Sequence, residues 1–324
     1  MSNTYPPPFD NPLVSILIPT HNRPEYFRQA LASALAQTYQ NLEIIVSDDS
    51  ADDRTETLVR ETVHDPRVTY VHHKNFKMPQ NITWLLTQFH GDYFQLLMDD
   101  DLIAPEKIET MLDCYRACPT ATLVTSYRQL IDSNGNTLPD IRETQRIANE
   151  PTLFKGAAVR RRLLEDELNF LGEPSTVLLK RDCQADMLKI WSTYHANADL
   201  VTWMHLCTHG DVVYLPQPLN FFRHHEGQDQ KDHHILFEGY CEWCHIYLDA
   251  IAQETDDAQK RVYWKRYFMN MNGLVAILLP TLRASLLAGG DTFAAHEQVL
   301  SVEGAVARVQ RHFERVAFFT KNLA

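Results

Sequence analysis

Glycine is scarce in the first part of this chain: the 324 residues include 11 glycines, and none comes before Gly91. A Walker-type phosphate loop and a G-x-G-x-x-G dinucleotide turn both need glycine in a tight turn between a strand and a helix. Neither motif can therefore exist in the residues that precede Gly91. Nucleotide binding in this region would have to use side chains and ordinary loop backbone.

Positive charge and long apolar runs are also in short supply. The chain has 30 Lys and Arg against 42 Asp and Glu, and its net charge of -12 argues against a general nucleic-acid binder. The most apolar late run, Gly273 to Leu282, is interrupted by Pro280 and is too short to span a bilayer. The Pro-rich start lacks the pattern of a signal peptide, so we expect a disordered lead-in over residues 1–12 and a cytoplasmic protein.

Cysteine is present but sparse, with 6 residues in the chain. Cys241 and Cys244 form a CxxC pair without a second such pair, and Cys114 and Cys118 are one helical turn apart. Zinc or redox chemistry would need a fuller ligand pattern, so we favour reduced, partly buried thiols.

Short apolar runs alternate with helical patterns over the first hundred or so residues, and this alternation predicts an α/β fold. We expect a mostly parallel central sheet with helices on both faces, and a first helix from Pro24. A strand, a turn at Asn134-Gly135 and a return follow Pro119, then a helix over Lys155 to Phe170 and a buried strand in "GEPSTVLLKR". From about residue 236 the pattern is helical. The first four expected strands are Val14 to Ile18, Leu42 to Val46, Val68 to Val71 and Tyr93 to Met98.

Polar stretches follow three of these strands: "PTHNR" the first, "SDDSADD" the second and "MDDD" the fourth. Ligands of open α/β sheets bind beyond the carboxyl ends of the strands, so these stretches should meet there. Asp52 and Asp53 we interpret as caps of the next helix. The like charges of residues 99–101 repel unless a cation or a helix start accommodates them. Either Asp101 caps a helix from Ala104 to Tyr115, or the acids hold a divalent metal that carries an anionic substrate.

The ordered succession of motifs resembles the family 2 glycosyltransferases, which are inverting enzymes of the GT-A fold. The stretches that carry the resemblance are "VSILIPTHNRPEYFRQALASALAQTYQNLEIIVSDDSADDRT", "GDYFQLLMDDDLIAPEKIETM" and "LPQPLNFFRHH". The resemblance implies a GT-A domain over residues 13–235, followed by a helical C-terminal region over residues 236–324.

The resemblance also implies which residues bind the nucleotide sugar. A carboxylate can accept the imide N–H of uracil or thymine, which gives an acid a reason to contact a base. Asp100 matches the metal-ligating aspartate of the family's D-x-D region, while Met98 replaces the frequent first acid; the expected ion is Mg2+ or Mn2+. The implied nucleotide contacts are Pro19, Thr20, Asn22, Arg23, Asp48, Asp49 and Asp99.

"FFRHH" resembles the family's R-x-H ending and implies that His225 completes the metal or diphosphate site, with Arg223 in support. The neighbouring His224, His233 and His234 lack the spacing of a zinc site, and we place them in a solvated loop. Asp101, Glu173 and Arg223 are candidates for acceptor or diphosphate contacts.

A general base must remove the acceptor hydroxyl's proton. Asp199 in "ANADLVTWMHL" aligns with the family's base, although the adjacent acid pair often seen there is missing. The alternative is that Asp199 caps the helix from Leu200, and Glu173 is then the reserve candidate.

The expected activity is metal-dependent, inverting sugar transfer from a UDP or dTDP sugar to a hydroxyl of a saccharide, lipid-linked or protein acceptor, in polysaccharide or glycoconjugate synthesis. A nucleotidyltransferase would need a triphosphate-binding loop rich in glycine and in basic residues, and such a loop is missing. A non-catalytic relative that binds a sugar nucleotide or a partner protein is the remaining alternative.

The tail carries one more pattern, since "KRVYWKRYF" at residues 260–268 mixes four cations with four aromatics. One interpretation is peripheral contact with the inner face of an anionic membrane or with a lipid-linked acceptor. From the sequence we favour the other interpretation, in which this segment packs on the catalytic domain or forms a homodimer through the C-terminal helices.

Overall fold

The computed structural model of the chain describes residues 11–73, 76, 78–225, 233–288, 292–293 and 300–301. These residues belong to two compact units. The first unit comprises the described residues up to 163 together with 167–193 and 202–225. The second comprises 164–166, 194–201 and the described residues beyond 226.

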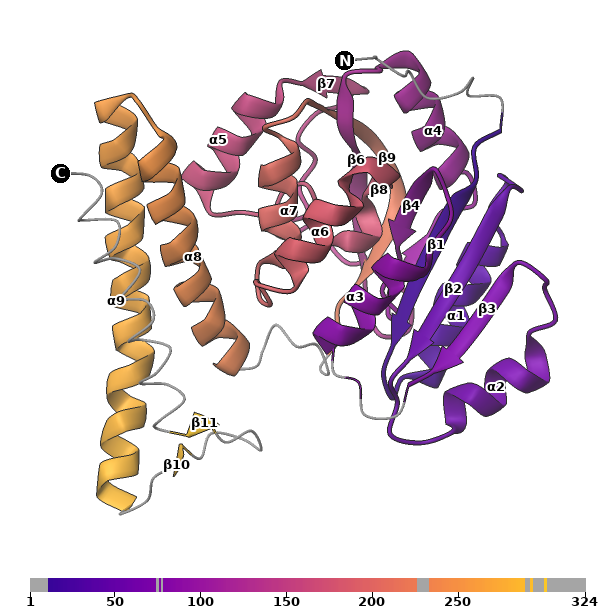
Figure 1. Ribbon diagram of the computed structural model, residues 1–324, viewed down its shortest axis with the longest axis horizontal. Coiled ribbons are helices and arrows are strands. Elements are labelled where there is room, and N and C mark those ends of the chain that lie inside the picture. Colours follow the sequence, from indigo (N-terminus) through magenta and orange to yellow (C-terminus); the bar gives the residue numbers. More distant parts are fainter. Residues whose placement is uncertain are drawn as a thin grey trace. The chain divides into compact units, whose positions relative to one another are not determined.

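Four parallel strands form one half of the sheet in the first unit, in the order β3, β2, β1, β4 (Figure 1). Helices connect them, as parallel strands require. The strands are β1 (Val14–Thr20), β2 (Leu42–Asp48), β3 (Val68–His72) and β4 (Tyr93–Leu96), and the helices are α1 (Pro24–Leu35), α2 (Arg54–Thr62) and α3 (Met78–Gln88).

The other half of the sheet is mixed. β8 runs antiparallel to both β4 and β6, β6 and β9 are parallel, and β5 and β7 each pair antiparallel with β9. The elements are β5 (Leu102–Ile103), α4 (Lys107–Ala117), β6 (Ala121–Ile131), β7 (Thr152–Phe154), α5 (Gly156–Asp166), η1 (Pro174–Thr176), β8 (Leu178–Lys180), η2 (Arg181–Cys183), α6 (Gln184–Trp191), α7 (Ala198–Leu206) and β9 (Asp211–Arg223).

β1 explains why helices cover both faces of the sheet. Every residue of this strand is buried, as expected for a central strand of a parallel sheet. Val14, Ile16 and Ile18 belong to a core cluster that includes residues of α1 and α4. Leu17 lies between them in sequence and so faces the other side, where α3 packs on β1 and β2. The expected α/β fold with a mostly parallel central sheet is confirmed.

Several expected boundaries differ from the structure. The helix predicted from Lys155 to Phe170 ends at Asp166, because Glu167 adopts a left-handed conformation with φ 49° and its amide bonds to Leu163. The strand predicted in "GEPSTVLLKR" is a short 3-10 turn followed by β8. The return after Gly135 is an isolated bridge between Ile131 and Thr137.

The helix-cap explanation of Asp101 is wrong. α4 begins at Lys107, several residues later, and its N-cap residue is Glu106. Asp101 instead accepts a hydrogen bond from the amide of Arg223, at the end of β9. Asp52 and Asp53 come before α2. Asp52 accepts a hydrogen bond from the amide of Arg54, as the cap interpretation requires, whereas Asp53 makes no side-chain cap bond.

The second unit contains α8 (His233–Gln253) and α9 (Asp257–Ala288), which pack together. Tyr247 of α8 stacks on Trp243 and meets Tyr263 of α9 at a ring distance of 6.2 Å. The short strands β10 (Thr292–Phe293) and β11 (Leu300–Ser301) pair antiparallel, so the expectation of a wholly helical tail is wrong there.

Two findings bear on the ends and on the membrane question. Residues 1–10 of the expected lead-in lie outside the described residues, while the carbonyl of Asn11 accepts a hydrogen bond of 2.9 Å from Asn41. In the described part of the chain, no helix combines the length and the apolar character needed to cross a bilayer.

Candidate active site

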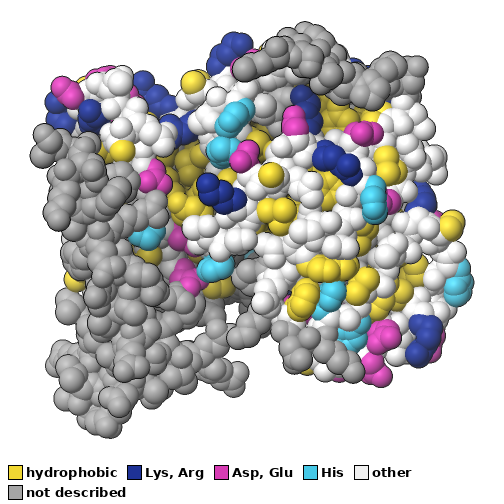
Figure 2. All heavy atoms as spheres, in the orientation of Figure 1, with side chains coloured by type: hydrophobic (Ala, Val, Ile, Leu, Met, Phe, Trp, Pro, Cys, Tyr) yellow, Lys and Arg dark blue, Asp and Glu magenta, His cyan; other side chains and the backbone are white. Residues whose placement is uncertain are grey.

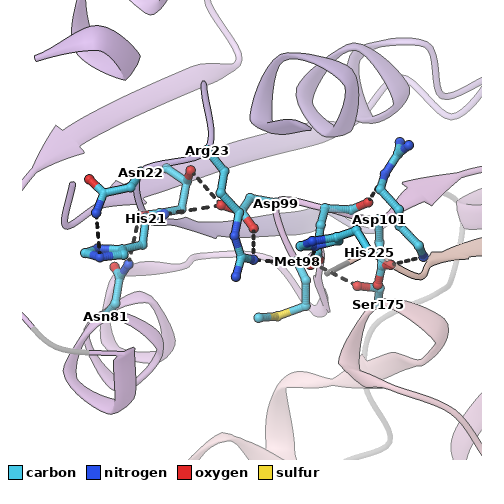
Figure 3. A network of polar contacts seen from close by, with 12 residues as sticks. His21, Asn22, Arg23, Asn81, Met98, Asp99, Asp101, Ser175 and His225 are labelled. Carbon is cyan, nitrogen blue, oxygen red and sulfur yellow. Dashed lines mark hydrogen bonds and ion pairs between the residues drawn. The ribbon is translucent and has the colours of Figure 1, made fainter. Parts of the chain in front are cut away.

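The loops after β1 and β4 meet at Asp99 (Figure 3). The hydroxyl of Thr20 donates to Oδ2 of Asp99 at 2.9 Å, and the amide of His21 donates to the same oxygen at 3.2 Å. Thr20 ends β1, in which Pro19 is paired with Ser47 of β2. The neighbouring carboxyl ends of β1 and β4 thus join through Asp99, as the sequence predicts.

Asn22 joins the loop after β1 to the loop after β2. Its backbone has φ 55°, a left-handed conformation that asparagine tolerates better than most residues. Its amide donates to the hydroxyl of Ser50 at 2.7 Å, and its side-chain oxygen accepts from the amide of Ala51 at 2.9 Å. Asn22 therefore holds the two loops in a fixed register.

The acid pair after β2 has two different environments. Asp48 is fully buried, and its two oxygens accept from the amide of Ser50 at 2.8 Å and the hydroxyl of Tyr70 at 2.5 Å. Asp49 lies 3.1 Å from Nδ1 of His21 and accepts from Nδ2 of Asn81, also at 3.1 Å. Burial raises the pKa of Asp49. Both oxygens of Asp48 are thus used in hydrogen bonds within the protein, whereas Asp49 contacts His21 of the loop after β1.

Arg23 bridges the two acids that follow β4. One guanidinium nitrogen lies 3.2 Å from a carboxylate oxygen of Asp99 and 3.2 Å from one of Asp100. Burial and the neighbouring Asp100 raise the pKa of Asp99. Arg23 and the hydrogen bonds from Thr20 and His21 oppose this rise, and the resulting pKa is about 6. The guanidinium offsets the crowding of carboxylates in the triplet.

Asp100 also meets His225. Nε2 of His225 lies 3.1 Å from Oδ2 of Asp100, and the imidazole packs against the ring of Tyr26 at 5.0 Å. Only 13% of the Asp100 side chain and 8% of the His225 side chain are exposed. One carboxylate and one imidazole therefore converge from β4 and β9.

This pair fits part of a divalent metal site. Carboxylate oxygen suits Mg2+ and Mn2+, and imidazole nitrogen suits transition metals. Within the described residues no group of three or more His, Cys, Asp or Glu could hold a metal by itself. Asp100 and His225 suit an ion that takes its other ligands from a bound diphosphate and water.

Arg223, at the end of β9, is completely buried. Its Nε donates to the carbonyl of Asp100 at 2.7 Å, and another guanidinium nitrogen donates to Gln29 of α1 at 2.9 Å. Its backbone amide donates to Asp101, which is buried as well. Both side chains are enclosed by protein and hold the acid loop in place, and their contact with a ligand stays a prediction.

A buried joint of Asp101, Lys107 and Ser175 supports the acid loop. The hydroxyl of Ser175 accepts from the amide of Met98 at 2.9 Å and bonds to Asp101, while Nζ of Lys107 donates to the carbonyl of Ser175. Burial raises the pKa of Asp101 and lowers that of Lys107, whose side chain is fully enclosed. The sequence analysis missed Lys107 and Ser175, because neither stands in a motif that distinguishes it from a surface residue.

Glu173 is two residues before Ser175 and pairs with an arginine. Its Oε2 lies 2.7 Å from Nε of Arg128, another residue the sequence analysis missed. Arg128 also donates to the carbonyl of Asn169 at 2.8 Å. Burial raises the pKa of Glu173, although 17% of its side chain stays exposed.

Asp199 belongs to the second unit and lies in the first turn of α7. One of its oxygens accepts from the amide of Leu200 at 2.6 Å, and its role as base stays a prediction. The side chains of His233 and His234 lie outside the described part, and His224 is exposed. All six cysteines are free.

A doubly covered α/β sheet with an acid cluster beyond β1, β2 and β4 defines the chain as a protein of the GT-A type. Residues 15–182 match the model of glycosyl transferase family 2, which is more than half of the chain. The chain belongs to that family.

Curated relatives match over parts of their length. An uncharacterised glycosyltransferase of Rickettsia typhi is 35% identical over 149 residues, which are 46% of this chain and 45% of that protein. The chondroitin synthase of Escherichia coli is 33% identical over 126 residues, 39% of this chain and 18% of that protein. The chain thus matches less than half the length of these relatives.

Solved structures share the fold. TarS 1-349 of S. aureus in complex with UDP-GlcNAc superposes with a TM-score of 0.59 at 16% identity, covering 79% of this chain and 72% of that one. The mannosyltransferase PcManGT of Pyrobaculum calidifontis, in complex with GDP-Man and Mn2+, gives 0.53 at 16% identity, covering 86% and 79%. At such identities the likeness shows the fold alone.

Proposed function

We propose that this chain transfers a sugar from a nucleoside diphosphate sugar to an acceptor hydroxyl with inversion at the anomeric carbon. The observation that carries the proposal is the meeting of Arg23, Asp100 and His225, which follow the carboxyl ends of β1, β4 and β9. A cation, a carboxylate and an imidazole at one place suit a diphosphate with its metal ion. Family membership supports the same activity.

Asp49 is our candidate for the contact with the base. A carboxylate can accept the imide N–H of uracil or thymine, so a UDP or dTDP sugar is the proposed donor. Both oxygens of Asp48 already accept hydrogen bonds from Ser50 and Tyr70, which leaves Asp48 a structural part. Thr20 and Asn22 then position the loop, since their side chains bond to Asp99 and Ala51.

Asp100 and His225 would hold Mg2+ or Mn2+, and such an ion neutralises charge that grows on a leaving diphosphate. Arg23 supplies a second cation beside them, already held by Asp99 and Asp100. Arg223 orients the loop by bonding to the carbonyl of Asp100.

The proposed reaction is a single displacement. The acceptor oxygen attacks the anomeric carbon, the bond from that carbon to the diphosphate breaks, and the hydroxyl proton passes to the carboxylate of Asp199. No protein nucleophile is required. Glu173 is the alternative base, but its carboxylate is already held in an ion pair with the guanidinium of Arg128.

The acceptor class we propose is a saccharide, lipid-linked or protein hydroxyl in polysaccharide or glycoconjugate synthesis. The name of the chondroitin synthase relative supports the polysaccharide part.

A thermal-shift panel of UDP, dTDP and GDP sugars, each with Mn2+ or with EDTA, tests donor binding. We expect stabilisation by UDP or dTDP sugars that EDTA reduces, because the ion and the donor bind together. Stabilisation without sugar transfer to any acceptor would favour the non-catalytic relative. No stabilisation by any sugar nucleotide would contradict the proposal.

A further inference from the structure

Charge is segregated in the tail. Residues 258–290 contain five Lys or Arg and no Asp or Glu, in a chain whose net charge is -12. On the face of the first unit that Figure 2 shows, cations, carboxylates and histidines are interspersed. The nearest acids of the tail, Asp256 and Asp257, stand at the start of α9, one turn before Arg261. A local cationic surface therefore exists on an acidic protein.

The exposed side chains of α9 share one side of the helix. Their spacing of three and four residues places them on one face. Phe268 is 58% exposed, Met269 49%, Val275 43% and Val262 38%, which is unusual for large apolar side chains. We call this set the basic-apolar face; its exposed members are Asp257, Ala258, Arg261, Val262, Lys265, Phe268, Met269, Asn272, Val275 and Ala276.

The opposite side of α9 is used for packing within the second unit. Tyr263, Tyr267 and Leu274 are buried, and Gly273 approaches Tyr240 of α8 so closely that an added Cβ would lie 2.6 Å from its ring. The helix therefore cannot rotate to hide Phe268 and Met269 without losing this contact. The basic-apolar face is turned outward by the packing of α8 on α9.

We propose that the basic-apolar face of α9 binds an anionic lipid surface. Arg261 and Lys265 come first along the helix, and the apolar side chains from Phe268 onward follow them. Such an order lets the cations meet phosphate headgroups while the apolar end enters the boundary with the acyl chains. The proposal is independent of the transferase activity.

A second copy of the chain fits this face less well. It would present the same side chains, in which the one exposed carboxylate, Asp257 at the start of α9, is outnumbered by Arg261 and Lys265. Cations buried without a partner are costly, whereas anionic headgroups pair with them and stay hydrated.

Co-sedimentation of the full chain with vesicles tests the proposal, with phosphatidylcholine alone compared with a mixture that contains phosphatidylglycerol. We expect binding to the anionic vesicles at low ionic strength, and weaker binding as salt screens the charges. Arg261→Glu with Lys265→Glu should weaken this binding at least about tenfold. Phe268→Ser with Met269→Ser should weaken it at every salt concentration.

Matched controls lie on the first unit. Arg28→Glu with Arg54→Glu makes the same change of charge at exposed residues, and Leu153→Ser removes an apolar side chain that is 44% exposed. These variants should bind like the unaltered chain, and circular dichroism checks that all variants are folded. Absence of binding at low ionic strength, or equal losses in the controls, overturns the proposal. The proposal is also overturned if the chain does not bind vesicles and instead forms a dimer that Phe268→Ser dissociates.

Discussion

Nε2 of His225 lies 3.1 Å from Oδ2 of Asp100, although 125 residues separate them in the sequence. β9 ends at Arg223, two residues before the histidine, and Arg223 is fixed to the carbonyl of Asp100. The same strand end therefore supplies both the imidazole and the support of the acid loop. This relationship underlies the predictions on the site.

Asp100→Asn should abolish sugar transfer while the fold survives. The substitution keeps the shape of the side chain and removes the charge that an Mg2+ or Mn2+ ion needs. We expect kcat to fall about a hundredfold or more, with an unchanged melting temperature in the absence of metal. Asp52→Asn, at an exposed acid of a neighbouring loop, serves as the control. Normal turnover of Asp100→Asn in EDTA would refute a metal role.

Asp199→Asn should bind donor and metal normally and lose transfer. The amide keeps an oxygen for the amide of Leu200 but cannot accept the acceptor's proton. Loss of a general base lowers kcat by about a hundred- to ten-thousand-fold. Turnover of Asp199→Asn and of Glu173→Gln, measured side by side, decides between the two acids. A fully active Asp199→Asn together with an inactive Glu173→Gln would assign the role of base to Glu173.

The buried joint should prove energetically coupled. Lys107→Met removes the amine that bonds to the carbonyl of Ser175 and should cost about 1 to 3 kcal/mol of unfolding free energy, because a buried polar group loses its partner. Asp101→Asn alters the acid of the same joint, so the loss in the double variant should be smaller than the sum of the two single losses. Urea unfolding of the two single variants and the double variant measures the coupling. Strict additivity would show that the two residues act separately.

The stability of the unaltered chain should depend on pH through Lys107. Burial lowers the pKa of this amine in the folded chain below the 10.5 of an ordinary lysine. Between the lowered pKa and 10.5 the unfolded chain binds more protons, so unfolding free energy rises with pH. As the pH rises toward 10.5, the unfolding free energy of the unaltered chain should therefore increase relative to that of Lys107→Met. Parallel curves would mean that Lys107 keeps an ordinary pKa.

The fold was largely predictable because its strongest signals are local. β1 to β4 are short apolar runs bounded by polar residues, and helical patterns separate them. Boundaries were less accessible, since the end of α5 depends on one left-handed residue, Glu167, whose type gives little hint of it.

The candidate site was predictable only where residues stand in motifs. Asp99, Asp100 and His225 belong to such motifs, and the structure brings them to one place. Lys107 follows Glu106 at the start of α4 and looks like a surface lysine; its burial comes from the packing of α4 on β9 and from its bond to Ser175 of η1. The enclosure of Asp101 and Arg223 is likewise a tertiary effect.

Product formation is the decisive test of metal-dependent, inverting sugar transfer by this chain. The donor that stabilises the chain most is incubated with a panel of hydroxyl acceptors, and nucleoside diphosphate and glycoside are followed together by NMR. We predict release of diphosphate with Mn2+, a glycoside of inverted anomeric configuration, and neither product with EDTA or with Asp100→Asn. A glycoside that forms at the same rate in EDTA, or one with retained configuration, would contradict the account.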